Sequence, residues 1–243
     1  MATEFDIGFE TGDFSECTAY TSDADFTINS TNPLFGTYDL KADIVQSDYF
    51  YVNKDVTEAG QTQFRWRFYF DPRSITIGNG EMFTIAEWYG DNSGPDAQVS
   101  VYFRYDTGTG HRFYFAVWDD ENAVEVADYS DVIAVDEKHY IEIYITKATN
   151  ATSNDGTVEY WVDGVSQAAS SSYDNFNEFD DASSYFRFRL LVFSVDAGTS
   201  GAVYWDAWKC NNDGSEIGPV ASGTPGIRPF GINKGLHRKV TIG

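Results

Sequence analysis

The clearest pattern in the chain is an alternation of apolar and polar positions over residues 61–71, QTQFRWRFYFD. Side chains alternate across an extended strand with a period of two. The four even-numbered aromatic residues from position 64 to 70 would therefore face one side, and Arg65, Arg67 and Tyr69 would face the other. This pattern predicts a strand with one apolar face and one cationic, aromatic face.

The same alternation recurs at residues 99–105, 111–118 and 185–192. Its outward positions in those segments include Tyr102, Arg104, Arg112, Tyr114, Arg187 and Arg189. Six of the nine arginines thus fall on outward positions of four predicted strands. We interpret them as one glycan-binding face, on which tyrosine rings stack on sugars and guanidinium groups donate hydrogen bonds. The alternative is a ladder in which the arginines pair with Glu142 and Glu159 and bind nothing.

Composition favours an all-β fold. Aromatic residues make up 17% of the 243 residues, and turn-forming clusters of Gly, Ser, Asn and Asp separate the alternating segments. These features are typical of a sandwich or barrel. The pattern predicts a first strand at Phe5–Glu10, loop from there to the strand that begins at residue 36, and a long polar loop at 170–184. Two cysteines, Cys17 and Cys210, could form a disulfide or stay free.

The termini and apolar runs bear on localisation. We find neither a secretion signal nor an apolar run long enough for a transmembrane helix, so we expect no membrane insertion. The expected location is a virion surface if a phage encodes the chain, and otherwise the cytoplasm or the outside after non-classical release.

Charge divides the chain into two parts. Residues 1–219 hold 12 basic and 38 acidic residues, a balance of −26, whereas residues 220–243 hold four basic residues and no acidic one. The acidic part argues against binding to nucleic acid. We predict a domain over residues 1–219 and an extended arm over residues 220–243. The basic residues of the arm, which would dock it on another copy of the chain or on an acidic virion neighbour, are Arg228, Lys234, Arg238 and Lys239.

Several short motifs resemble those of the concanavalin A-like, laminin G-like jelly-roll superfamily. They are GFETGDFSE at 8–16, GTYDLKA at 36–42, the predicted hairpin at 138–165 and VYWDAWKCNNDGSEIGP at 203–219. The resemblance implies an antiparallel two-sheet jelly-roll sandwich. It also implies a structural Ca²⁺ between the first and last strands, with Glu10 and Asp206 as side-chain ligands, since Ca²⁺ prefers oxygen ligands.

The chain does not carry the catalytic sequence patterns of jelly-roll enzymes. The chain lacks the E-x-D-x-x-E run of jelly-roll glucanases and the R-x-E-x-R, Q-I-H and Y-x-K-x-G patterns of jelly-roll lyases. We therefore expect a non-catalytic component of a larger assembly, such as a phage capsid decoration or tail protein. A free-standing lectin and a jelly-roll polysaccharide lyase or glucanase are the alternatives.

Overall fold

The computed structural model describes residues 3–44, 49–57, 60–90, 97–118, 125–173, 175, 179 and 185–221. Every element bounded within these ranges is a strand. The fifteen strands are β1 (Thr3–Ile7), β2 (Ala19–Tyr20), β3 (Phe26–Asn29), β4 (Asp39–Ile44), β5 (Phe50–Thr57), β6 (Gln63–Asp71), β7 (Met82–Tyr89), β8 (Val99–Asp106), β9 (Gly110–Trp118), β10 (Glu125–Tyr129), β11 (His139–Thr146), β12 (Gly156–Val162), β13 (Val165–Tyr173), β14 (Tyr185–Phe193) and β15 (Gly201–Asn211). No helix in the described ranges is long and apolar enough to cross a membrane.

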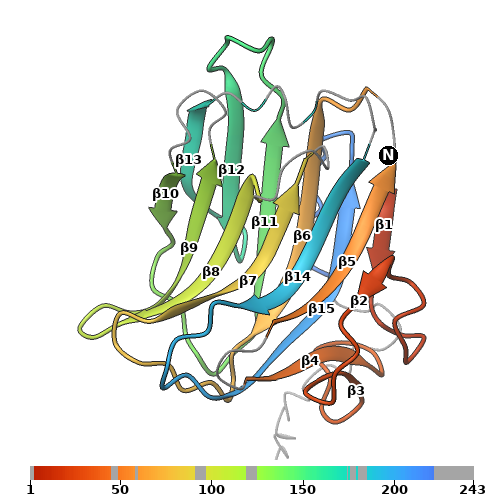
Figure 1. The fold of residues 1–243 in the computed structure, drawn as a ribbon, viewed down its shortest axis with the longest axis vertical. Helices are drawn as coiled ribbons and strands as arrows, with labels where there is room; N and C mark the ends of the chain where they lie inside the picture. The colour runs from red at the N-terminus through yellow and green to blue at the C-terminus, as the bar shows by residue number, and fades with distance from the viewer. Residues whose placement is uncertain are drawn as a thin grey trace, which may run out of the picture.

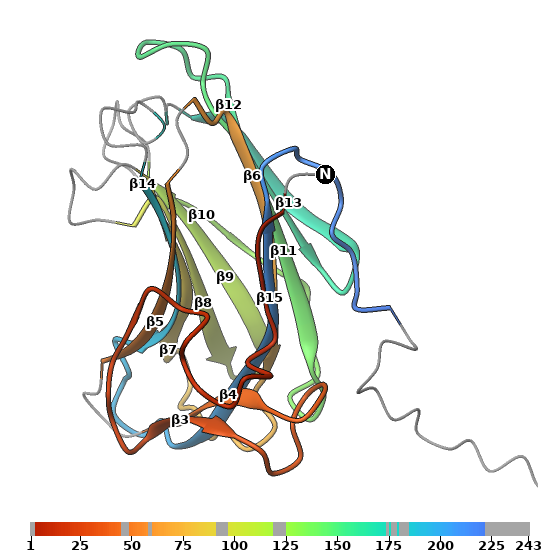
Figure 2. The same ribbon diagram turned by 90° about the vertical axis from the view of Figure 1, so that its right-hand side faces the viewer.

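The strands form two antiparallel sheets that face each other (Figures 1 and 2). Sheet A has the order β13-β12-β11-β6-β15-β4-β3, and β1 pairs with β15 beside this path. Sheet B has the order β10-β9-β8-β7-β14-β5-β2. This arrangement confirms the predicted all-β jelly-roll sandwich.

The core lies between the sheets and is rich in aromatic rings. The even-numbered aromatic residues of β6 are fully buried, as the alternation predicts. From sheet B, Phe188 packs edge-on against Phe64 at 5.5 Å and against Trp66 at 5.6 Å between ring centroids. Edge-to-face contacts of this kind add to the stabilisation that comes from burying the rings.

Residues after β13 contribute to one end of the core. The sequence predicts a long polar loop at 170–184, but β13 continues to Tyr173. Phe179 is buried against Trp88 at 5.2 Å, and the Asn175 side chain accepts a bond from the Ala148 backbone N–H. This part of the predicted loop therefore covers the sandwich.

Local differences from the prediction have identifiable causes. Strands β2 and β3 lie where the sequence predicts only loop, because they span two and four residues and are too short to show a clear alternation. The first strand ends at Ile7 rather than Glu10, and Phe9 has a φ of 58°, which extended chain does not allow. Cys17 and Cys210 are both free.

Candidate functional site

The predicted arginine face is divided between two sheets. Strand β6, which carries Arg65 and Arg67, lies in sheet A, whereas β8, β9 and β14 lie in sheet B. The outward direction of the six arginines was predicted correctly, but the interpretation that they share one surface was wrong. Alternation distinguishes inward from outward positions, and it does not tell which strands pair in one sheet.

On sheet A, Arg67 binds the chain's own backbone. Its side chain donates to the Ala207 carbonyl oxygen from Nη2 at 2.9 Å and to the Gly218 carbonyl oxygen from Nη1 at 2.8 Å. Strand β15 bulges between Asp206 and Lys209 next to this contact. Arg67 as a whole is only 4% exposed, so its side chain is part of the structure rather than a free surface group.

Residues 212–221, here called the C-terminal strap, run along the outer side of sheet A (Figure 2). The buried Glu142 carboxylate accepts the backbone N–H groups of Ile217 at 3.0 Å and Gly218 at 2.8 Å, and it forms an ion pair with Arg65. The Tyr69 hydroxyl accepts the backbone N–H of Val220 at 3.0 Å. The alternative interpretation, in which Glu142 is the partner of an arginine, is thus confirmed on this face.

On sheet B, Arg189 lies at the centre of a polar cluster, the Arg189 cluster, which consists of Arg189, Asn53, Glu87, Tyr49 and Tyr89. Its Nε donates to the Asn53 side-chain oxygen at 2.8 Å. Its Nη1 donates to the hydroxyls of Tyr49 at 2.8 Å and Tyr89 at 2.9 Å, and it lies 3.3 Å from a Glu87 carboxylate oxygen. The Tyr89 hydroxyl donates in turn to Glu87 at 2.7 Å. Two phenols and one carboxylate therefore converge on one guanidinium.

Burial controls the protonation of this cluster. It raises the pKa of the Glu87 carboxyl, although hydrogen bonds from Tyr89 and Arg189 act in the opposite direction. Burial also raises the pKa of Tyr89, and the adjacent Glu87 raises it further. Tyr89 is therefore a proton donor rather than a phenolate at neutral pH. Tyr49 and Phe193, in edge-on contact at 5.2 Å, are 43% and 45% exposed beside the cluster.

A row of tyrosines crosses the other half of sheet B. Tyr102, Tyr114 and Tyr129, here called the tyrosine row, are register neighbours on β8, β9 and β10. Their ring centroids are 5.5 Å and 4.9 Å apart. Arg112 lies over the Tyr129 ring at 4.1 Å, a cation–π contact. Such a row offers several ring faces side by side on one surface.

The other arginines of sheet B are ion-paired. Asp106 accepts from Arg104 at 2.9 Å and from Arg112 at 2.6 Å, and these hydrogen bonds hold the pKa of its carboxyl below the usual value. Arg187 donates to Asp55 at 2.9 Å. The structure thus brings together on one outer face the six predicted residues Tyr102, Arg104, Arg112, Tyr114, Arg187 and Arg189.

Sequence reasoning missed part of this surface. It did not select Tyr49, Tyr89 and Tyr129. Of the neighbours Trp88 and Tyr89, Trp88 is fully buried, and Tyr89 belongs to the Arg189 cluster. Trp88 and Tyr89 are adjacent aromatic residues, so the sequence does not tell which of the two points inward. A bulge in β7 between Thr84 and Ala86 also shifts the phase of the alternation.

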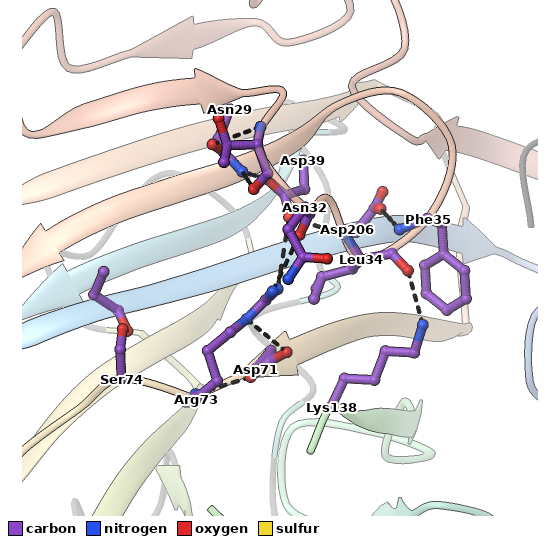
Figure 3. A network of polar contacts seen from close by, with 12 residues as sticks. Asn29, Asn32, Leu34, Phe35, Asp39, Asp71, Arg73, Ser74, Lys138 and Asp206 are labelled. Atoms are coloured by element: carbon purple, nitrogen blue, oxygen red, sulfur yellow. Dashed lines mark hydrogen bonds and ion pairs between the residues drawn. The ribbon is translucent and has the colours of Figure 1, made fainter. Parts of the chain in front are cut away.

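A loop before β4 is held by the buried carboxyl groups of Asp39 and Asp206 and by Lys138 (Figure 3). Asp39 accepts the backbone N–H of Leu34 at 3.0 Å, and Asp206 accepts that of Phe35 at 2.9 Å. The Lys138 ammonium group donates to the Leu34 carbonyl oxygen at 2.7 Å. These bonds fix the loop against the ends of sheet A strands.

The residues expected to bind calcium, Glu10 and Asp206, line one cavity of about 350 Å³. Both Glu10 oxygens accept the Thr37 backbone N–H at 3.0 Å. Burial raises the pKa of Asp206 to about 8, and the Asp39 and Glu10 carboxylates add to the increase. Among the described residues, no group of three or more His, Cys, Asp or Glu side chains could hold a metal. The two carboxylates fit a hard cation chemically, but carbonyl oxygens or water would have to complete its coordination.

The comparisons with known proteins agree with the fold. No protein-family model and no curated protein sequence matches the chain. Alginate lyase Aly36B superposes with a TM-score of 0.61 at 12% identity, covering 87% of this chain and 98% of the lyase. The globular domain of T. cruzi calreticulin superposes with a TM-score of 0.56 at 10% identity, covering 87% of this chain and 88% of the calreticulin domain. Botulinum neurotoxin type C gives 0.57 at 11% identity, covering 88% of this chain and 49% of that chain.

These similarities and the strand order establish the class: the protein is an all-β, two-sheet jelly-roll sandwich. At such identities they establish the fold alone. They also contradict the prediction of a non-catalytic protein, because alginate lyases are among the similar structures. Missing sequence patterns were a poor reason to exclude enzymes, since a shared fold at this identity need not preserve local motifs.

Proposed function

We propose that the protein binds a polysaccharide on the outer face of sheet B. The observation that carries this proposal is the tyrosine row, with the Arg189 cluster on the same face. Tyrosine rings stack on the C–H faces of sugars, and their hydroxyls bond to sugar hydroxyls. Two of the similar proteins are described with carbohydrate ligands, Aly36B with an alginate trisaccharide and the neurotoxin with gangliosides. The outer face of sheet A is a poorer choice because the C-terminal strap lies on it.

Affinity electrophoresis in gels that contain a panel of polysaccharides tests the proposal. The wild-type protein should be retarded by at least one polymer, and Tyr114→Ala should weaken that binding about tenfold, the effect of losing roughly 1–2 kcal/mol of ring contact. Tyr144→Ala is the matched control, because it removes the same side chain from sheet A. If Tyr144→Ala weakens binding and Tyr114→Ala does not, the proposed face is wrong.

The Arg189 cluster favours a second candidate function, a polysaccharide lyase. Cleavage of a uronate chain by β-elimination needs a cation to neutralise the sugar carboxylate, a base and a proton donor. Arg189 would neutralise the sugar carboxylate, the Glu87 carboxylate beside it would take the C5 proton, and Tyr89 would give its proton to the leaving oxygen as the double bond forms. Incubation with alginate and other uronate polymers tests this candidate, because elimination creates an unsaturated sugar that absorbs ultraviolet light.

A place in a larger assembly stays a separate hypothesis. Similarity to the solved structures lends no support to a phage virion role, and the basic arm residues Arg228, Lys234, Arg238 and Lys239 lie outside the described residues. The domain division at residue 219 likewise stays a prediction. Deletion of residues 222–243 tests the arm: self-association measured by sedimentation should be lost if the arm docks on another copy.

We also propose that Glu10 and Asp206 hold a structural Ca²⁺. Bound Ca²⁺ would neutralise the buried Asp206 carboxylate and link the segment after β1 to β15. Without it, the raised pKa means that the folded state holds a proton that the unfolded state releases, so stability should fall as pH rises toward about 8. Added Ca²⁺ should then raise the melting temperature more at pH 8 than at pH 5. Equal melting temperatures with Ca²⁺ and with a chelator at pH 8 would exclude the site.

A further inference from the structure

Every arginine described on the outer face of sheet B has a carboxylate partner from the same face. Arg104 and Arg112 share Asp106, Arg187 pairs with Asp55, and Arg189 pairs with Glu87. Four guanidinium groups therefore meet three carboxylates. The positive charge that the sequence suggests for this surface is largely neutralised within it.

An anionic sugar would have to compete with these partners. A uronate that bound Arg189 would displace Glu87, whose side chain is only 10% exposed. Glu87 would then be a buried carboxylate without its cation, or would have to take up a proton, and either change opposes binding. A sugar hydroxyl, in contrast, can bond to the tyrosine hydroxyls and to remaining N–H groups while the ion pairs persist.

Long-range electrostatics also opposes the binding of an anionic polysaccharide. The chain carries a formal net charge of −22, and residues 1–219 alone carry −26. A polyanion is repelled by such a protein until it comes within about one Debye length, roughly 8 Å at physiological salt, of a local positive patch. The ion-paired surface offers no strong patch of that kind among its described side chains.

We infer that the outer face of sheet B takes a neutral polysaccharide and discriminates against uronate and sulfated chains. This inference rests on the proposed glycan-binding function and specifies its ligand. The tyrosine row supplies ring faces whose contact with sugars does not depend on ligand charge. The paired arginines keep those rings in place through cation–π contacts, as Arg112 does over Tyr129.

Affinity electrophoresis with matched neutral and anionic polymers tests the inference. The neutral probes are β-glucan, galactomannan and xylan, and the anionic probes are alginate, polygalacturonate and a sulfated galactan. We expect at least one neutral polymer to retard the wild-type protein, every anionic polymer to retard it much less at low salt, and added salt to leave the neutral binding unchanged.

A charge-removing variant makes the test sharper. Asp106→Asn keeps the size of the side chain and frees one charge on Arg104 and Arg112, so affinity for alginate should rise roughly two- to fivefold, the effect of one surface ion pair. Asp155→Asn, in the loop between β11 and β12, removes the same charge elsewhere and should leave alginate binding unchanged.

The outcomes separate the inference from the proposed function. Tighter binding to alginate or polygalacturonate than to any neutral polymer, or cleavage of either, would overturn the inference and keep the polysaccharide-binding face. An equal gain for Asp106→Asn and Asp155→Asn would also overturn it, because the local ion pairs would then not matter. Absence of binding to every polymer in both sets would remove the proposed function, and the inference with it.

Discussion

The outer faces of the two sheets are built from the same residue types but are used differently. On sheet A, Arg67 and Glu142 bond to backbone groups of the C-terminal strap and of β15. On sheet B, Arg104, Arg187 and their partners bond to other side chains of the same face. Side chains that hold buried backbone become part of the fold, whereas side chains that pair only with one another can still meet a ligand. The partner, and not the residue type, decides between the two roles.

The largest effect on stability should come from Arg67→Ala. The change leaves the buried Gly218 and the partly buried Ala207 carbonyl oxygens without their donors, and each loss costs about 1–3 kcal/mol. We expect the free energy of unfolding to fall by about 3 kcal/mol in urea titrations, while glycan binding by the remaining folded protein is unchanged. Arg67→Lys is the control that keeps the charge. A loss below 1 kcal/mol together with weaker glycan binding would place Arg67 in the binding face after all.

Glu142→Gln should have the next largest effect. Its carboxylate accepts two strap N–H groups and pairs with Arg65, and an amide has only one accepting oxygen. We expect a loss of about 2 kcal/mol and faster amide hydrogen exchange at Ile217 and Gly218, since the strap opens locally. Glu159→Gln, on the neighbouring strand β12, is the matched control. Unchanged exchange at Ile217 would mean that Glu142 does not hold the strap.

Near neutral pH, the charge on His139 should make a smaller contribution to the stability of the fold. Its Nδ1 lies 2.6 Å from an Asp163 carboxylate oxygen and its Nε2 lies 2.7 Å from the Ala134 carbonyl oxygen. Only the doubly protonated ring can donate to both. Burial alone would lower the pKa of His139, but these two hydrogen bonds raise it above the usual value.

Because the pKa of His139 is raised in the folded state, its charged ring contributes its full stabilisation of the fold below pH 6.5. This stabilisation is lost as pH rises through the folded-state pKa. Asp163→Asn preserves the turn, since asparagine tolerates the φ of 52° found there. The His139 contribution to the decrease in stability as pH rises above 6.5 should disappear in this variant. Identical pH profiles of wild type and variant would show that His139 is not charged in the fold.

The sequence predicted the fold better than it predicted the functional site. Alternation placed the core side of β6 and β14 correctly, because burial follows the period of a strand. It could not show that β6 pairs with β11 and β15 while β14 pairs with β5 and β7, since such pairings join residues far apart in the chain. The roles of Arg65 and Arg67 depend on the strap, whose position only the folded chain reveals.

The smallest stability effect should come from Arg187→Ala on sheet B. Its pair with Asp55 is partly exposed, and ion pairs of this kind contribute about 0.2–1 kcal/mol. We expect a loss below 1 kcal/mol in urea titrations, roughly a third of that for Arg67→Ala. A stability loss as large as that of Arg67→Ala would mean that the arginines of both sheets hold the fold. The structural difference between the two outer faces would then no longer favour sheet B over sheet A as the binding surface.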